Sequence, residues 1–87
     1  MTFRVEVTPA ARRDLVKLPR DVLRRVDAHI LALADNPRPP GTKKLQGDEG
    51  FFRVRVGDYR ILYTVEHHRL VILIVRIRHR REAYRIS

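Results

Sequence analysis

The chain has 87 residues, no cysteine and a formal net charge of +9 at pH 7. This length predicts one domain over residues 1–87, and a hydrophobic content of 44% is enough for one core. Without cysteine there is no disulfide, thiol nucleophile or thiolate metal site. The first residues lack the apolar run of a signal peptide, and the longest apolar run, residues 70–75, is too short to span a bilayer. We therefore expect a cytoplasmic protein without a membrane partner.

The first half of the chain predicts a strand followed by two helices. Residues 3–7 alternate apolar and charged side chains, the pattern of a half-buried strand. Thr8 and Pro9 are typical of a helix N-cap and its first position. Pro19 interrupts this helix, and a second helix is predicted over about residues 21–34. The second helix has an apolar stripe formed by Val22, Val26, Ile30 and Leu33.

The second half predicts a sheet. A loop with three prolines, residues 35–42, separates it from the helices. Segments with strand-like patterns follow, the first of them short, at residues 43–46, 51–56, 59–66 and 70–77. The last segment is apolar on both faces, which favours the centre of the sheet. We predict an α+β fold with an N-terminal strand, two packed helices and then a three- to four-stranded antiparallel sheet.

Most of the excess positive charge lies in residues 36–60 and 76–87. This clustering favours a polyanionic partner, either a nucleic acid or an acidic protein. The alternative is a generally basic, solvated surface. The four histidines have no metal-ligand spacing, and no glycine-rich phosphate loop occurs, so neither a metal site nor a cofactor is expected.

The order of these elements, with the strings "KKLQG", "FFRVRVGDYRILYTVE" and "RHRREAYR", resembles the RelE/ParE superfamily of bacterial and archaeal toxins. The resemblance covers essentially the whole chain and begins with "VEVTPAARRDLVKLP". It implies a RelE-like α+β toxin with a cognate antitoxin. That antitoxin would be RelB-like: acidic, partly disordered, and wrapped around the toxin through an amphipathic helix. The RelE branch cleaves messenger RNA on the ribosome without a metal, whereas the ParE branch inhibits DNA gyrase.

The resemblance also implies the residues of the site. Arg60 in the "GDYR" strand, Arg80, and the later Tyr84 match positions that RelE-type enzymes use in catalysis. Because ParE-type proteins usually lack the terminal tyrosine and part of the basic set, these residues favour the RelE branch. The histidine that precedes Arg80, His79, is a further catalytic candidate. The remaining basic residues are expected to bind RNA: Lys43, Lys44, Arg53, Arg55, Arg78 and Arg81.

The chemistry of RNA cleavage suits these residue types. The 2′-hydroxyl attacks the adjacent phosphate, and the planar guanidinium of arginine donates paired hydrogen bonds to phosphate oxygens. Arginine does not lose its proton in proteins and so cannot be the base. Nearby guanidinium groups favour the phenolate form of Tyr84, which would act as the base or stack on a nucleobase. His79 would act as the acid, since imidazole exchanges protons near neutral pH.

Structural and functional alternatives remain open at this point. Arg53 and Arg55 could form only the solvated face of an edge strand, where charge discourages aggregation. Arg60 could be a structural ion-pair partner, and Tyr84 could pack on the core. Two other functions fit the same sequence: a gyrase inhibitor without nuclease activity, and a non-catalytic nucleic-acid-binding module whose binding depends on salt.

Overall fold

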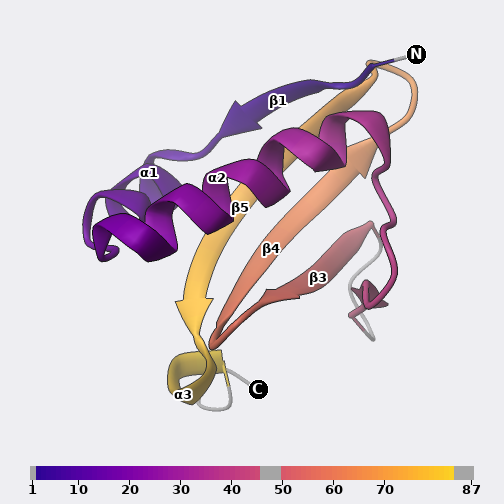
Figure 1. Ribbon diagram of the computed structural model, residues 1–87. Coiled ribbons are helices and arrows are strands. Elements are labelled where there is room, and N and C mark those ends of the chain that lie inside the picture. The colour runs from indigo at the N-terminus through magenta and orange to yellow at the C-terminus, as the bar shows by residue number, and fades with distance from the viewer. Residues whose placement is uncertain (1, 46–49, 84–87) are drawn as a thin grey trace.

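The computed structural model describes residues 2–45 and 50–83 (Figure 1). The chain begins with a strand and two helices and continues into a sheet, as the sequence predicts. In chain order the elements are β1 (Arg4–Val7), α1 (Pro9–Val16), α2 (Arg20–Asp35), β2 (Lys43–Lys44), β3 (Phe51–Val56), β4 (Tyr59–Glu66), β5 (Val71–His79) and α3 (Arg80–Ala83). The α+β class is therefore confirmed.

The sheet has five strands in the order β1-β5-β4-β3-β2. The four strands after the helices pair antiparallel, as predicted, whereas β1 pairs parallel to β5 and makes the sheet mixed. Strand β5 thus has neighbours on both sides, which agrees with its apolar residues on both faces. No described helix is both long and apolar enough to cross a membrane.

Helices α1 and α2 pack on one face of the sheet, and α2 crosses that face in Figure 1. Thr8 is the N-cap of α1, where its hydroxyl accepts a hydrogen bond from Ala11 N–H at 3.1 Å. A short connection, residues 17–19, joins α1 to α2, and its last residue, Pro19, is the N-cap of α2. The apolar stripe of α2 enters the core, with Val26 and Leu33 at most 1% exposed.

The core fills the space between these helices and the facing side chains of the sheet. Strands β3, β4 and β5 contribute Phe52, Val54, Val56, Ile61, Tyr63, Ile72, Ile74 and Ile77, all buried. Tyr63 is fully buried, and its hydroxyl donates to the Pro37 carbonyl at 2.6 Å. This bond satisfies the phenol inside the core and fixes the proline-rich loop to the sheet.

A bulge in β5 decides which side chains lie on each face. Tyr63 pairs with Ile74, but the preceding Leu62 pairs with Arg76, so Val75 is an extra residue in β5. Without it, strict alternation would place Arg76 and Arg78 on the same face as Ile74, inside the core. With it, Ile77 faces the core, and both arginines lie on the opposite face. We call that opposite face, which points away from α1 and α2, the open face.

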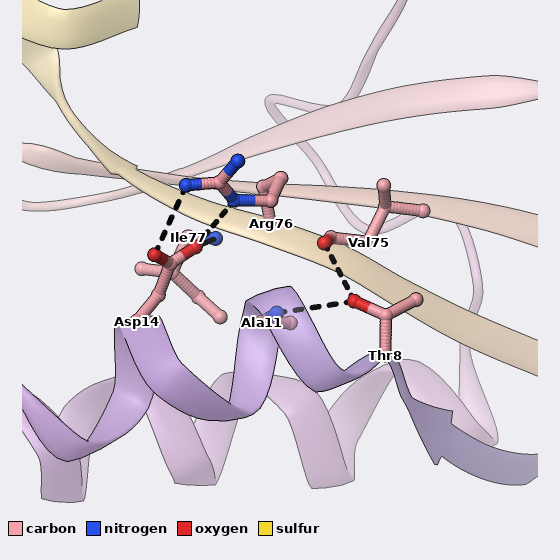
Figure 2. Close-up of polar contacts among 6 residues, drawn as sticks. All are labelled: Thr8, Ala11, Asp14, Val75, Arg76 and Ile77. Carbon is pink, nitrogen blue, oxygen red and sulfur yellow. Dashed lines mark hydrogen bonds and ion pairs between the residues drawn. The ribbon is translucent and has the colours of Figure 1, made fainter.

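Helix α1 completes the edge of β5 beyond the end of β1 (Figure 2). Thr8 N–H donates to the Ile74 carbonyl at 3.0 Å, and the Thr8 hydroxyl donates to the Val75 carbonyl at 2.8 Å. One turn after Ala11, the Asp14 carboxylate accepts from Ile77 N–H at 3.0 Å. These contacts replace the strand partner that β5 lacks here and hold the bulged residue in place.

Candidate functional site

Three arginines on neighbouring strands form one row across the open face. The register places Arg55 on β3 opposite Arg60 on β4, and Arg60 opposite Arg78 on β5. We call these three residues the arginine row. Arg55 is exposed, whereas Arg60 and Arg78 are half-buried. Since directly opposed side chains on one face lie close together, the row concentrates guanidinium groups in a small area.

A second line of cations runs beside the arginine row. Lys43 on the short edge strand β2 pairs with Arg53, which pairs with Leu62, and Leu62 pairs with Arg76. The strands β3, β4 and β5 have a single carboxylate, Glu66, at the far end of β4, where it binds Arg69 at 3.0 Å. Near α3 these strands therefore contribute cations and no carboxylate to the open face, and the described carboxylates that pair with cations there, Asp14 with Arg76 and Asp58 with Arg80, come from α1 and the hairpin turn.

The hairpin between β3 and β4 sets the register of the row. Gly57 has a φ of +60°, a backbone conformation that favours glycine. A Cβ at this position would lie 2.6 Å from Nη2 of Arg25, which covers the turn from α2. The Gly57 carbonyl accepts from Nε of Arg55 at 2.9 Å. The tight turn thus fixes both the pairing of Arg55 with Arg60 and the orientation of Arg55.

The first turn of α3 brings Arg80 to the same hairpin. Arg80 N–H donates to the Asp58 carbonyl at 2.7 Å, and its Nη1 lies 3.8 Å from the Asp58 carboxylate. Both side chains are more than half exposed, so this ion pair leaves the Arg80 guanidinium accessible. Arg81 follows on α3 and is exposed. The structure therefore gathers Arg80 with Arg55 and Arg60 at one end of the sheet.

Two sequence candidates, His79 and Lys44, are not gathered there. His79 pairs with Tyr59 on the helix-side face, with their rings edge-to-face at 5.2 Å, so it points away from Arg60. Lys44 pairs with Phe52 and likewise alternates to the helix side, unlike its neighbour Lys43. Tyr84 lies outside the described residues.

Asp14 is a residue of this region that the sequence did not single out. It accepts two hydrogen bonds from Arg76, from Nε at 2.8 Å and from Nη2 at 3.2 Å, in addition to the bond from Ile77 N–H (Figure 2). Its side chain is only 14% exposed. The sequence signal was its place between Ala11 and Leu15 on the buried side of α1, an unusual position for a carboxylate.

The environment of Asp14 favours its charged form. Burial on its own raises the pKa of the Asp14 carboxyl. The hydrogen bonds from Arg76 and Ile77, together with the positive charges of Arg76 and Arg78, outweigh burial and lower this pKa below its ordinary value. Asp14 therefore stays ionised at neutral pH and ties the end of β5 to α1.

Comparison with known proteins identifies the family. A family model described as the ParE toxin of the type II toxin–antitoxin system parDE matches residues 5–84. Toxin RelG of Mycobacterium tuberculosis is 36% identical over 98% of this chain and 99% of its own length. The putative toxin RelE1 of Methanocaldococcus jannaschii is 34% identical over 98% of each chain.

A solved structure agrees with this result. The archaeal RelE–RelB complex from Pyrococcus horikoshii contains a chain that superposes with a TM-score of 0.82 at 32% identity, covering 92% of this chain and 97% of that one. The fold is thus RelE-like, as the sequence predicts. This chain belongs to the RelE/ParE family and is a RelE-like toxin of a type II toxin–antitoxin system.

Proposed function

We propose that this toxin is a metal-independent endonuclease that cleaves messenger RNA on the ribosome. The single observation that supports this most is the arginine row of Arg55, Arg60 and Arg78 on the open face. Attack of a 2′-hydroxyl on the neighbouring phosphate builds up negative charge on the phosphate oxygens. Fixed guanidinium groups stabilise such charge, and a rigid sheet holds them in position before the reaction begins.

Arg60 has the central place in this mechanism. It lies between Arg55 and Arg78, and it is half-buried, so its guanidinium is held more firmly than that of an exposed side chain. Its Nη1 donates to the Tyr59 carbonyl at 3.3 Å, which further restricts the side chain. Arg80, beside the hairpin, supplies a second clamp on the phosphate.

The proton transfers need other residues, because arginine keeps its proton. Tyr84 remains the proposed base or base-stacking group, four positions after Arg80. His79 remains the proposed acid only if the RNA reaches the helix side of β5, since the register points its ring away from Arg60. Lys43, Arg53 and Arg81 would hold the flanking phosphates, where positive charge attracts RNA without reading its sequence.

A RelB-like antitoxin is the proposed partner. The P. horikoshii structure is a RelE–RelB complex. An acidic antitoxin segment would find complementary charge on this chain, whose formal net charge is +9. An antitoxin segment that covered the arginine row would block access of messenger RNA and so inhibit the toxin directly.

The test compares ribosome-bound and free messenger RNA. Purified wild-type toxin is added to ribosomes stalled on a defined message, and primer extension locates any cleavage. Cleavage in the A-site codon on ribosomes, with none on the same RNA alone, supports the proposal. Growth arrest without cleavage would contradict it, and a DNA-supercoiling assay would then test gyrase, the target of the ParE branch.

A further inference from the structure

A cleft of about 490 Å³ opens on the other side of β5 from the centre of the arginine row. Asp14, Lys17 and Leu18 line it at the C-terminal end of α1. Tyr59 and the last four residues of β5, residues 76–79, line it from the sheet. Its position follows from the short β1, because no strand continues along this part of the edge of β5.

The cleft has a positive lining. Lys17, Arg76 and Arg78 contribute three cations, and Asp14 contributes the one carboxylate among its described lining residues. The Asp14 charge is already compensated by the two bonds from Arg76 and the bond from Ile77 N–H. Lys17 is exposed on the rim. The occupant that suits this lining is an anion.

The cleft also offers flat, ring-shaped surfaces. The rings of Tyr59 and His79 meet edge-to-face within its wall, and both side chains are half-buried. Nδ1 of His79 accepts a hydrogen bond from Arg81 N–H at 3.3 Å. In the neutral ring the proton is then on Nε2, which is a donor. Aromatic faces beside cations are what proteins use to bind single-stranded nucleotides.

Arg78 connects the cleft to the arginine row, because it belongs to the row and also lines the cleft. An RNA strand crossing the row would therefore reach the cleft by passing around the edge of β5. We propose that the cleft binds one nucleotide next to the cleaved phosphate, with Lys17 at the phosphate and the Tyr59–His79 pair against the base. This rests on the proposed function and adds a substrate subsite to it.

Lys17→Ala tests the subsite without disturbing the core, because the side chain is exposed. Arg12→Ala is the control, since it removes one exposed cation from α1, the helix that Lys17 caps, but lies outside the cleft lining. We expect Lys17→Ala to raise the toxin concentration for half-maximal cleavage on programmed ribosomes by about 5- to 10-fold, the effect of one lost phosphate contact. The cleavage rate of Lys17→Ala at saturating toxin should stay within about 2-fold of wild type. For Arg12→Ala, both the half-maximal concentration and the rate should stay within about 2-fold of wild type.

Direct binding is measured on the full chain by NMR titration with adenosine monophosphate and, separately, with inorganic phosphate. We expect adenosine monophosphate to shift the resonances of Tyr59 and His79, and to bind the Lys17→Ala variant at least about 5-fold more weakly. Equal responses to both ligands would overturn the base contact. An absent response to adenosine monophosphate would overturn the subsite as a whole.

Failure of the subsite is distinguishable from failure of the proposed function. Wild-type cleavage with an unchanged Lys17→Ala variant would overturn the subsite alone. Absence of wild-type cleavage would overturn the function, and the titration would still decide whether the cleft takes a nucleotide. If Lys17→Ala weakened neutralisation by the antitoxin but left cleavage unchanged, the cleft would belong to the antitoxin and the subsite would be wrong.

Discussion

Arg60 on β4 lies directly opposite Arg78 on β5, and on its other side it lies opposite Arg55 on β3. Like charges in direct cross-strand pairs destabilise a sheet. A bound polyanion removes the repulsion. The proposed phosphate-binding role of the row accounts for this placement of like charges.

The first prediction separates stability from activity at this row. Arg60→Gln keeps the length of the side chain and removes the central charge. Because two like-charge pairs are relieved, each worth about 0.2–1 kcal/mol, the free energy of unfolding should stay unchanged or rise slightly. Urea denaturation measures it, with Arg12→Gln as the control. A loss of more than about 1 kcal/mol would show instead that Arg60 is a structural residue.

Thr8 is predicted to support the site through the bulge in β5. Thr8→Val keeps the shape of the side chain but removes the hydroxyl that caps α1 and binds the Val75 carbonyl. We expect a loss of about 1–2 kcal/mol in the free energy of unfolding. Cleavage should also slow, since the bulge is what places Arg78 on the open face. Thr42→Val is the control, because it also removes a hydroxyl that bonds a backbone carbonyl, that of Pro39, but in the loop before β2, the strand at the other edge of the sheet. Equal effects of both variants on cleavage would contradict this role.

Asp14→Asn tests the link between α1 and β5. The asparagine can still accept from Ile77 N–H but loses the charge-assisted bonds to Arg76. We expect the free energy of unfolding to fall by about 1.5–3 kcal/mol, against little change for the exposed Asp27→Asn. Thermal unfolding of both variants measures this. Equal melting temperatures for Asp14→Asn and wild type would show that the ion pair contributes nothing net.

The lowered pKa of Asp14 predicts a dependence of stability on pH. The folded protein binds this proton less readily than the unfolded chain, so the contribution is complete above the unfolded pKa of about 3.9. It is lost as the pH falls below about 4 and through the folded pKa. Between pH 6 and pH 3, wild type should therefore lose more stability than Asp14→Asn. If the free energy of unfolding fell equally with pH for wild type and Asp14→Asn, the Asp14 carboxylate would not be the source of this dependence.

Two neighbouring lysines provide an internal control for RNA binding by the open face. Lys43 is registered with Arg53 on the open face, whereas Lys44 is registered with Phe52 on the helix side. Lys43→Ala should lower the slope of log affinity against log salt by about 1, and Lys44→Ala should change it much less. Fluorescence anisotropy with a single-stranded RNA between about 50 and 200 mM salt measures the slope. Equal changes of slope for Lys43→Ala and Lys44→Ala would mean that RNA does not bind preferentially to the open face.

The sequence predicted those parts of the site that depend on local pattern. Strict alternation indicates that Arg53 and Arg55 share one face of β3 and that Arg60 shares a face of β4 with Leu62. The Gly57–Asp58 pair indicates a tight turn between these strands, and the register of the structure adds that Arg55 and Arg60 lie opposite each other on one face. The helices followed from Thr8, Pro19 and the spacing of apolar residues.

The remaining features depend on contacts between distant parts of the chain. The bulge at Val75 was hidden because β5 is apolar on both faces, so its sequence shows no break in alternation. The faces of Arg78 and His79 therefore could not be assigned. In the same way, a two-residue strand such as β2 has no pattern that distinguishes Lys43 from Lys44. The Asp14–Arg76 pair joins residues 62 positions apart, and nothing local indicates it.

The most direct measurement is the rate of cleavage on programmed ribosomes for wild type, Arg60→Ala and Arg12→Ala, followed by primer extension. Loss of the central guanidinium should slow cleavage by about 10²–10³-fold, the usual effect of removing one group that stabilises transition-state charge. Arg12→Ala should cleave like wild type, because its side chain lies on α1 away from the open face. Wild-type cleavage together with an equally fast Arg60→Ala variant would contradict a catalytic arginine row.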